Sequence, residues 1–284
     1  MLQSPFPGLR LEAAVPLRRA RLKLHAGLCA LFLGLSAAAA QAQPNPSGAA
    51  LPSAPQPQAQ SQTVTLRGAP GDILHDQAVI WTSPARIRAH DLLWLVPLGA
   101  ATGVAIATDR RAMRDVVSHE TSFNSDSVNA SNVLMGGYIA APAVIYGIGH
   151  LEHDSHAQQA GILTGEAMLD GVVVEQGMKL IFWRERPSSA DNYRGRFFQS
   201  NVGVDSSFPS SHSVIAWSAA ATIAGQYPSP WTQLAVYSAA GGISISRILG
   251  EEHFPSDVLV GSAAGWLIGH YVAHRHRWRR FRLR

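Results

Sequence analysis

Three short stretches between residues 179 and 257 hold the side chains with which this chain could do chemistry: 179–187 (KLIFWRERP), 208–213 (FPSSHS) and 246–257 (SRILGEEHFPSD). They present lysine, arginine, histidine and aspartate in an order that suits the binding of a phosphoryl group and its attack by an imidazole. No one of the stretches would be convincing alone.

In the first stretch, Lys179 and Arg186 lie seven positions apart and Pro187 follows directly. On a helix this spacing puts both cations on one face, and we expect Pro187 to end that helix. An ammonium and a guanidinium side by side could clamp a phosphate, because arginine offers two parallel donors. The alternative interpretation is a basic helix end that the helix dipole favours.

The second stretch precedes an apolar run, and Pro209 suits the first position of a helix. The backbone N–H groups of Ser210, Ser211 and His212 would then be among the unpaired donors of a helix N-terminus, which can bind an anion. His212 would lie beside these donors, where it could protonate a leaving oxygen. The alternative is an ordinary serine-capped helix start with a surface histidine.

In the third stretch, Gly250 is expected to end one helix and Pro255 to fall in the first turn of the next. His253 and Asp257 lie four positions apart, so their side chains can meet. A carboxylate on one imidazole nitrogen fixes the tautomer and makes the other nitrogen a better nucleophile. Arg247 could join the clamp. The alternative is a charged loop between helices.

Together the three stretches resemble the type 2 phosphatidic acid phosphatase and vanadium-dependent haloperoxidase superfamily. That family has a lysine separated by six residues from Arg-Pro, then Pro-Ser-Gly-His, then Ser-Arg with a spaced His and Asp. Every spacing is met here, and Ser211 stands where glycine is usual. A serine backbone still offers its N–H, so we expect little loss from this departure. The resemblance covers about residues 159–275.

The resemblance implies an all-α bundle in which His253 attacks phosphorus and forms a phosphohistidine. Asp257 would orient His253, and His212 would be the general acid that later helps to activate water. No metal would be needed, because fixed cations supply the charge stabilisation, and vanadate could replace phosphate as a mimic. The oxygens of the phosphoryl group would be held by Lys179, Arg186, Ser210, the Ser211 amide and Arg247.

The chain before these stretches divides by composition. Residues 1–42 combine a basic stretch, an apolar run and the small residues Ala40-Gln41-Ala42, a pattern that predicts a signal peptide. An uncleaved membrane anchor is the alternative. Residues 43–62 are rich in Pro, Gln, Ser and Ala and indicate a disordered linker. The single cysteine, Cys29, lies in the apolar run, which excludes disulfides from the remainder.

Apolar segments separated by Gly, Pro or charged residues follow the linker, and alternating strand patterns are scarce. We therefore predict an all-α fold: a single helical bundle of about six helices over residues 75–275, followed by a basic tail at 276–284. The segments are 90–107, 132–149, 159–183, 213–226, 232–249 and 257–273.

The formal net charge of +4 hides an uneven distribution, because basic residues gather before residue 43 and after residue 274. The middle of the chain is acidic, so a nucleic-acid partner is excluded for the folded part. The arginines of the tail could contact anionic lipid headgroups, which would give a peripheral membrane contact.

Each apolar segment is near the lower limit of about 20 residues for a bilayer span. Glu166, Asp170 and Glu175 would be costly within hydrocarbon. We therefore favour an exported domain, soluble or membrane-associated, in the periplasm or another extracytoplasmic space, over an integral one.

The sequence thus predicts an exported, metal-independent phosphatase that hydrolyses phosphomonoester or diphosphate bonds and requires no cofactor. Its substrate would be a phosphorylated small molecule or lipid, with lipid phosphates favoured by the expected location. The alternatives are a soluble non-specific acid phosphatase, a vanadate-dependent haloperoxidase and a non-catalytic module that binds phosphate or lipid.

Overall fold

The computed structural model describes residues 64–282, so the predicted signal peptide (1–42) and linker (43–62) lie outside the described residues. The predicted all-α fold is confirmed: the described part contains seven α-helices and no strand. They are α2 (Ala69–Thr82), α3 (Leu92–Asp115), α4 (Thr121–Leu151), α5 (Ser155–Phe182), α6 (Ser211–Gln226), α7 (Pro230–Leu249) and α8 (Pro255–Arg282).

Six of these helices correspond to the six apolar segments, and α2 is the additional one. Its sequence, APGDILHDQAVIWT, mixes acidic and apolar residues and gives no continuous apolar run. Polar contacts help to attach it to the bundle. Arg275 of α8 forms ion pairs with Asp72 (3.0 Å) and Asp76 of α2 and with Glu166 of α5 (3.3 Å). Helix α8 continues through the basic segment to Arg282.

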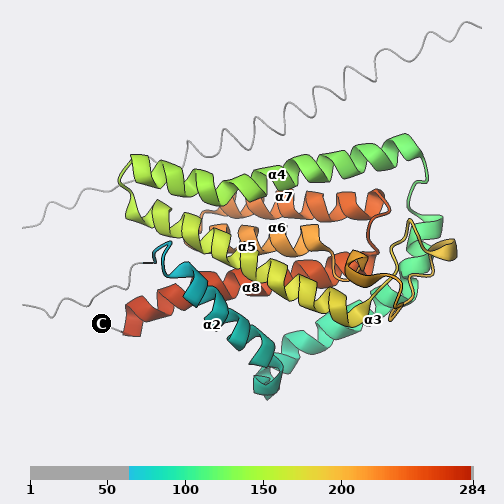
Figure 1. The fold of residues 1–284 in the computed structure, drawn as a ribbon, viewed down its shortest axis with the longest axis horizontal. Helices are drawn as coiled ribbons and strands as arrows, with labels where there is room; N and C mark the ends of the chain where they lie inside the picture. Colours follow the sequence, from blue (N-terminus) through green and yellow to red (C-terminus); the bar gives the residue numbers. More distant parts are fainter. Residues whose placement is uncertain (1–63, 283–284) are drawn as a thin grey trace, which may run out of the picture. The chain divides into compact units, whose positions relative to one another are not determined.

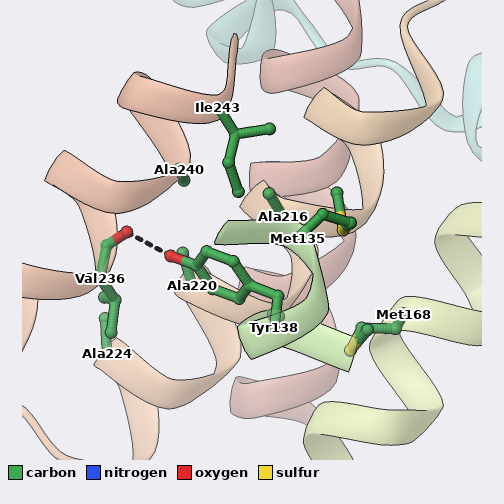
Figure 2. Packing of buried hydrophobic residues seen from close by; sticks show 10 residues of the cluster. Met135, Tyr138, Met168, Ala216, Ala220, Ala224, Val236, Ala240 and Ile243 are labelled. Carbon is green, nitrogen blue, oxygen red and sulfur yellow. Dashed lines mark hydrogen bonds between the residues drawn. The ribbon is translucent and has the colours of Figure 1, made fainter. Parts of the chain in front are cut away.

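Helix α6 lies inside the bundle and packs against α5, α7 and α8, while α4 covers α5 and α7 (Figure 1). Its buried side chains are small, because neighbours approach it from several sides. Met135 and Tyr138 of α4 and Ile243 of α7 fill the space around its alanines (Figure 2). The buried phenol of Tyr138 donates a hydrogen bond to the carbonyl of Val236, which ties α4 to α7.

Three glycines of α8 allow its backbone to pack directly against the backbone of α6. A Cβ atom added at Gly261 would lie 2.9 Å from the carbonyl oxygen of Ser210. At Gly265 and Gly269 the added atom would lie 2.2 Å from a carbonyl oxygen of α6. Since α6 begins with the second motif and α8 with the third, this close packing fixes how the two motifs meet.

Among the described residues, two helices are long and apolar enough to cross a bilayer, α3 and α4. None of the apolar window of α3 is buried, and Leu93, Val96 and Val104 are exposed along it. Several large side chains of α4 are also exposed, including Val133 and Ile139. Solvent-facing surfaces of this kind mark membrane or partner contacts.

The contact between α6 and α8 predicts that Gly265→Ala destabilises the protein. We expect the free energy of unfolding to fall by about 1–3 kcal/mol, as for other overpacked sites, measured by denaturant titration. Gly241→Ala in α7 is the matched control, because an added Cβ there meets nothing within 4 Å. That variant should be neutral or slightly more stable, since alanine favours helix. Equal stability of the two variants would contradict the proposed packing.

Candidate active site

The three motifs come together at one end of the bundle. This end holds the C-terminus of α5, the N-terminus of α6 and the turn between α7 and α8 (Figure 1). The loop 183–210 connects α5 to α6 and lies over the same end (Figure 1). Gly250 follows the last residue of α7 and Pro255 begins α8, as the sequence predicted.

The end of α5 differs from the prediction. We expected the helix to run to Pro187, but it ends at Phe182, and Trp183 adopts a left-handed conformation with φ 38°. The reason is a tertiary contact: the N–H of Arg184 donates to Ser206 Oγ at 2.9 Å instead of to the helix. Lys179 and Arg186 therefore do not share a helix face, and Arg186 reaches the site from the loop.

Arg184 is the buried centre of the region. Its Nη1 donates to Asp257 Oδ1 at 2.5 Å and its Nη2 to Asp109 Oδ2 of α3 at 2.7 Å. The guanidinium lies between the rings of Phe197 and Phe254, 4.5 and 4.2 Å from their centroids. Two carboxylates and two aromatic faces thus compensate a charge whose burial would otherwise be costly.

A glycine makes this packing feasible. The Nε of Arg184 donates to the carbonyl of Gly195 at 3.1 Å. Gly195 has a φ of +53°, and an added Cβ would lie 2.4 Å from the ring of Phe254. Any side chain at this position would displace Phe254 and with it the turn that carries His253.

His253 is almost fully buried, with 1% of its surface exposed. Its Nδ1 lies 2.8 Å from the carbonyl oxygen of Ser207 and 3.8 Å from Asp257 Oδ2. Only an N–H can bond to a carbonyl, so Nδ1 carries the proton and Nε2 keeps the lone pair in the neutral ring. We expected Asp257 to accept this hydrogen bond, but the carbonyl of Ser207 accepts it. The Asp257 carboxylate is farther from Nδ1 and acts on the ring as a nearby charge.

Asp257 also stabilises the start of α8. Its Oδ2 accepts from the N–H of Phe254 at 2.8 Å, which caps the first turn of α8. Burial lowers the pKa of His253, and the nearby Arg186 and Arg247 lower it further although Asp257 opposes them. A neutral His253 at ordinary pH is therefore favoured, with the lone pair on Nε2.

His212 stands in the first turn of α6, and its Nε2 lies 3.1 Å from Asn132 Oδ1 of α4. The imidazole N–H donates to this amide oxygen. The pKa of His212 is lowered to about 4, mainly by burial. The charges of four neighbours lower it further: Arg247, His253, Arg186 and Lys179. Side chains from the first and third motifs thus act on the imidazole of the second.

Lys179 forms a small network with Glu175 and Ser211. Its Nζ lies 2.7 Å from Glu175 Oε1 and donates to Ser211 Oγ at 2.9 Å. Ser211 Oγ in turn donates to the same carboxylate oxygen at 2.6 Å. Glu175 and Lys179 are buried one turn apart on α5, so the pair holds Lys179 against the start of α6.

The two remaining guanidiniums meet at one carboxylate. Glu252 Oε2 lies 3.0 Å from Arg186 Nη1 and 3.2 Å from Arg247 Nη2. Arg247 also donates to Ser131 Oγ at 3.3 Å, while its buried Nε has no hydrogen-bond partner among the described residues. A buried donor without a partner is costly, and an anion bound here could satisfy it. A hollow of approximately 380 Å³ opens beside Arg186, lined also by Glu185 and Asp205.

Helix α6 begins at Ser211, with Ser210 as its N-cap, so Pro209 precedes the helix instead of starting it. The first backbone hydrogen bond of the helix runs from the N–H of Val214 to the carbonyl oxygen of Ser210, at 3.0 Å. The helix ladder therefore leaves the N–H groups of Ser211 and His212 unused. The N–H of Ser210 is not available to a ligand, because it donates to the carbonyl of Asp257 at 3.1 Å.

The predicted residues thus form one connected group, in which Ser210 joins α6 to α8. Sequence reasoning missed several partners that position them. Only Glu175 gave a signal, as an acid four positions before a lysine. Asp109 and Asn132 lie far from the motifs in sequence. Arg184, Ser207 and Glu252 lie in or beside the motifs, but their partners come from other segments of the chain.

The site gathers fixed cations and two imidazoles at one end of a helical bundle, an arrangement that suits the binding of an anion. Residues 160–281 match the sequence profile of the PAP2 superfamily, and this part of the chain is a PAP2 superfamily domain. The predicted resemblance is confirmed. A stretch of 107 residues is 41% identical to a protein described as lipid A 1-phosphatase from Porphyromonas gingivalis. It covers 37% of this chain and 21% of that protein, so the chain spans about a fifth of its length. No solved structure matches the chain.

Removal of the Arg184 guanidinium should unfold this end of the protein. Arg184→Gln leaves Asp109 and Asp257 buried without their cation, and we expect a loss of about 3–5 kcal/mol in the free energy of unfolding. Arg196→Gln is the control, because Arg196 pairs with Glu185 at the surface at 3.0 Å. Its loss should be below about 1 kcal/mol. Similar values for both, measured by denaturant titration, would refute the central role of Arg184.

The electrostatics of His212 can be measured directly. We expect its imidazole to titrate with a midpoint near 4, as burial and the surrounding cations lower the pKa to about 4. In the unfolded chain His212 takes up its proton near pH 6.5. The lowered pKa of His212 in the folded protein therefore reduces the free energy of unfolding as the pH falls from about 6.5 towards 4. NMR titration, with the signal assigned by its absence in His212→Asn, provides the test. A midpoint at or above 6.5 would contradict the described surroundings.

Proposed function

We propose that the domain is a metal-independent phosphatase that forms a phosphohistidine on His253. The observation that supports this most directly is the state of His253. The ring is buried, its Nδ1 is committed to the carbonyl of Ser207, and its pKa is lowered by burial. The charges of Arg186 and Arg247 act on His253, and together with that of Lys179 they act on His212.

In the first step, Nε2 of His253 attacks phosphorus and the bond to the leaving oxygen breaks. The protonated His212 keeps its Nε2–H on Asn132 Oδ1 and gives its Nδ1 proton to that oxygen. The phosphorylated imidazole retains the proton on Nδ1 and carries a positive charge. The Ser207 carbonyl at 2.8 Å and the Asp257 carboxylate at 3.8 Å stabilise this charge.

In the second step, water attacks phosphorus, gives a proton to His212, and the N–P bond breaks. Inorganic phosphate leaves and His253 returns to its neutral form. His212 must be protonated to act as the acid, although four neighbours and burial lower its pKa to about 4 in the free protein. A phosphate dianion offsets those cations, so substrate binding itself should raise the pKa of His212.

The phosphoryl oxygens would be held by the fixed cations Lys179, Arg186 and Arg247, with the Ser211 and His212 N–H groups at the start of α6. These groups concentrate positive charge where negative charge develops, which is the usual basis of catalysis in phosphoryl transfer. We expect the activity to persist in the presence of EDTA. Ser210 would act by joining α6 to α8.

Lipid phosphates are the proposed substrates. The similar protein from Porphyromonas gingivalis is described as a lipid A 1-phosphatase. Independent support comes from α3 and α4, which expose apolar side chains and are long enough to enter a bilayer. We propose that these helices associate with a membrane and that residues 1–42 direct export to an extracytoplasmic space.

The proposal is tested with purified protein, EDTA and four labelled substrates: lipid A, phosphatidate, an isoprenoid diphosphate and p-nitrophenyl phosphate. We expect release of phosphate from a lipid substrate and a covalent phosphoprotein that is stable in base and labile in acid. His253→Ala should lower the rate by at least about 10⁴-fold, and His212→Ala by about 10²–10⁴-fold.

His150→Ala is the matched control, because His150 is exposed near the far end of α4 and should leave the rate unchanged. Release from p-nitrophenyl phosphate alone would favour a non-specific acid phosphatase. Full activity of His253→Ala, or no release from any substrate, would refute the proposed function.

A further inference from the structure

Glu252 occupies the place between two cations that a phosphoryl group would need. One of its oxygens, Oε2, lies 3.0 Å from Arg186 Nη1 and 3.2 Å from Arg247 Nη2. Both distances lie within the range of N–H···O hydrogen bonds, the kind of contact by which a guanidinium also holds a phosphate oxygen. In the free protein, therefore, a carboxylate of the chain itself bridges the two arginines of the clamp.

Two features indicate that this contact can be exchanged. The side chain of Glu252 is 32% exposed, whereas that of Arg247 is 7% exposed. Glu252 can therefore turn towards solvent, while Arg247 is fixed by its surroundings. Glu252 also leaves the buried Nε of Arg247 without a hydrogen-bond partner in the described part of the chain, so an anion with more acceptor oxygens would satisfy the site better.

We propose that Glu252 is an internal competitor of the phosphoryl group, which makes the site selective for doubly charged phosphate. The proposal rests on the proposed function, since it concerns the same clamp. A phosphomonoester dianion carries three terminal oxygens and can bond to Arg186, Arg247 and Lys179 together. A phosphodiester carries one charge and two such oxygens, so it matches the carboxylate in charge and gains little by displacing it.

The neighbouring Glu251 has different partners and serves as a matched control. Its carboxylate pairs with His119 and accepts from the hydroxyl of Tyr193 at 3.0 Å. The two glutamates are adjacent and carry the same charge, yet only Glu252 contacts the clamp. A general effect of removing negative charge from this turn would appear in both variants, whereas competition for the arginines would appear in one.

The test measures the binding of inorganic phosphate to the full chain by calorimetry, without turnover. Glu252→Gln should bind phosphate about tenfold more tightly than the wild type, because one charged acceptor no longer competes for the guanidiniums. Glu251→Gln should stay within about twofold of the wild type. Glu252→Gln should also hydrolyse methyl p-nitrophenyl phosphate, a diester, faster relative to p-nitrophenyl phosphate.

Unchanged or weaker phosphate binding by Glu252→Gln would overturn the proposal, because Glu252 would then position the arginines instead of competing for them. Equal tightening in Glu251→Gln would overturn it too. Glu252→Ala provides a second variant with the same expected direction. Tighter phosphate binding in a protein that hydrolyses nothing would refute the proposed function while supporting the competition.

Discussion

The site depends on one buried interaction, the contact of the Arg184 guanidinium with Asp109 and Asp257. Ion pairs of this kind gain little net stability, because both partners lose their hydration. Their value is positional: a buried charge must meet its partners, and those partners lie on α3 and α8. Arg184 therefore places the loop after α5, the C-terminal part of α3 and the first turn of α8 relative to each other.

The same network orients the proposed nucleophile. Asp257 receives Arg184 on one oxygen and caps α8 with the other. Ser207, whose carbonyl accepts from His253, is itself bonded through its N–H to the carbonyl of Arg184 at 2.9 Å. The tautomer of His253 is thus set by the backbone of a loop that Arg184 anchors, with Asp257 as a nearby charge.

Near the two imidazoles, the cationic side chains outnumber the carboxylates that pair with them. Glu175 partly compensates Lys179, and Glu252 compensates Arg186 and Arg247. The remaining positive field lowers the pKa of His212 together with burial. With Glu252 displaced, Lys179, Arg186 and Arg247 face one carboxylate, that of Glu175, so the proposed dianion would balance the remaining charge and favour the protonated form of His212.

The all-α fold class follows from the sequence alone, because long apolar runs without strand alternation are compatible with few other fold classes. The sequence also determined the helix ends at Gly250 and Pro255, where local backbone chemistry decides. Residue types and spacing predicted the candidate clamp of Lys179, Arg186 and Arg247, which stays a proposal. Only the tertiary structure decided where α5 ends, because a distant hydroxyl, Ser206, captures the N–H of Arg184. The same holds for the partners of His253 and His212, which are a backbone carbonyl and an amide from distant segments. Such contacts depend on packing between elements, and no local pattern encodes them.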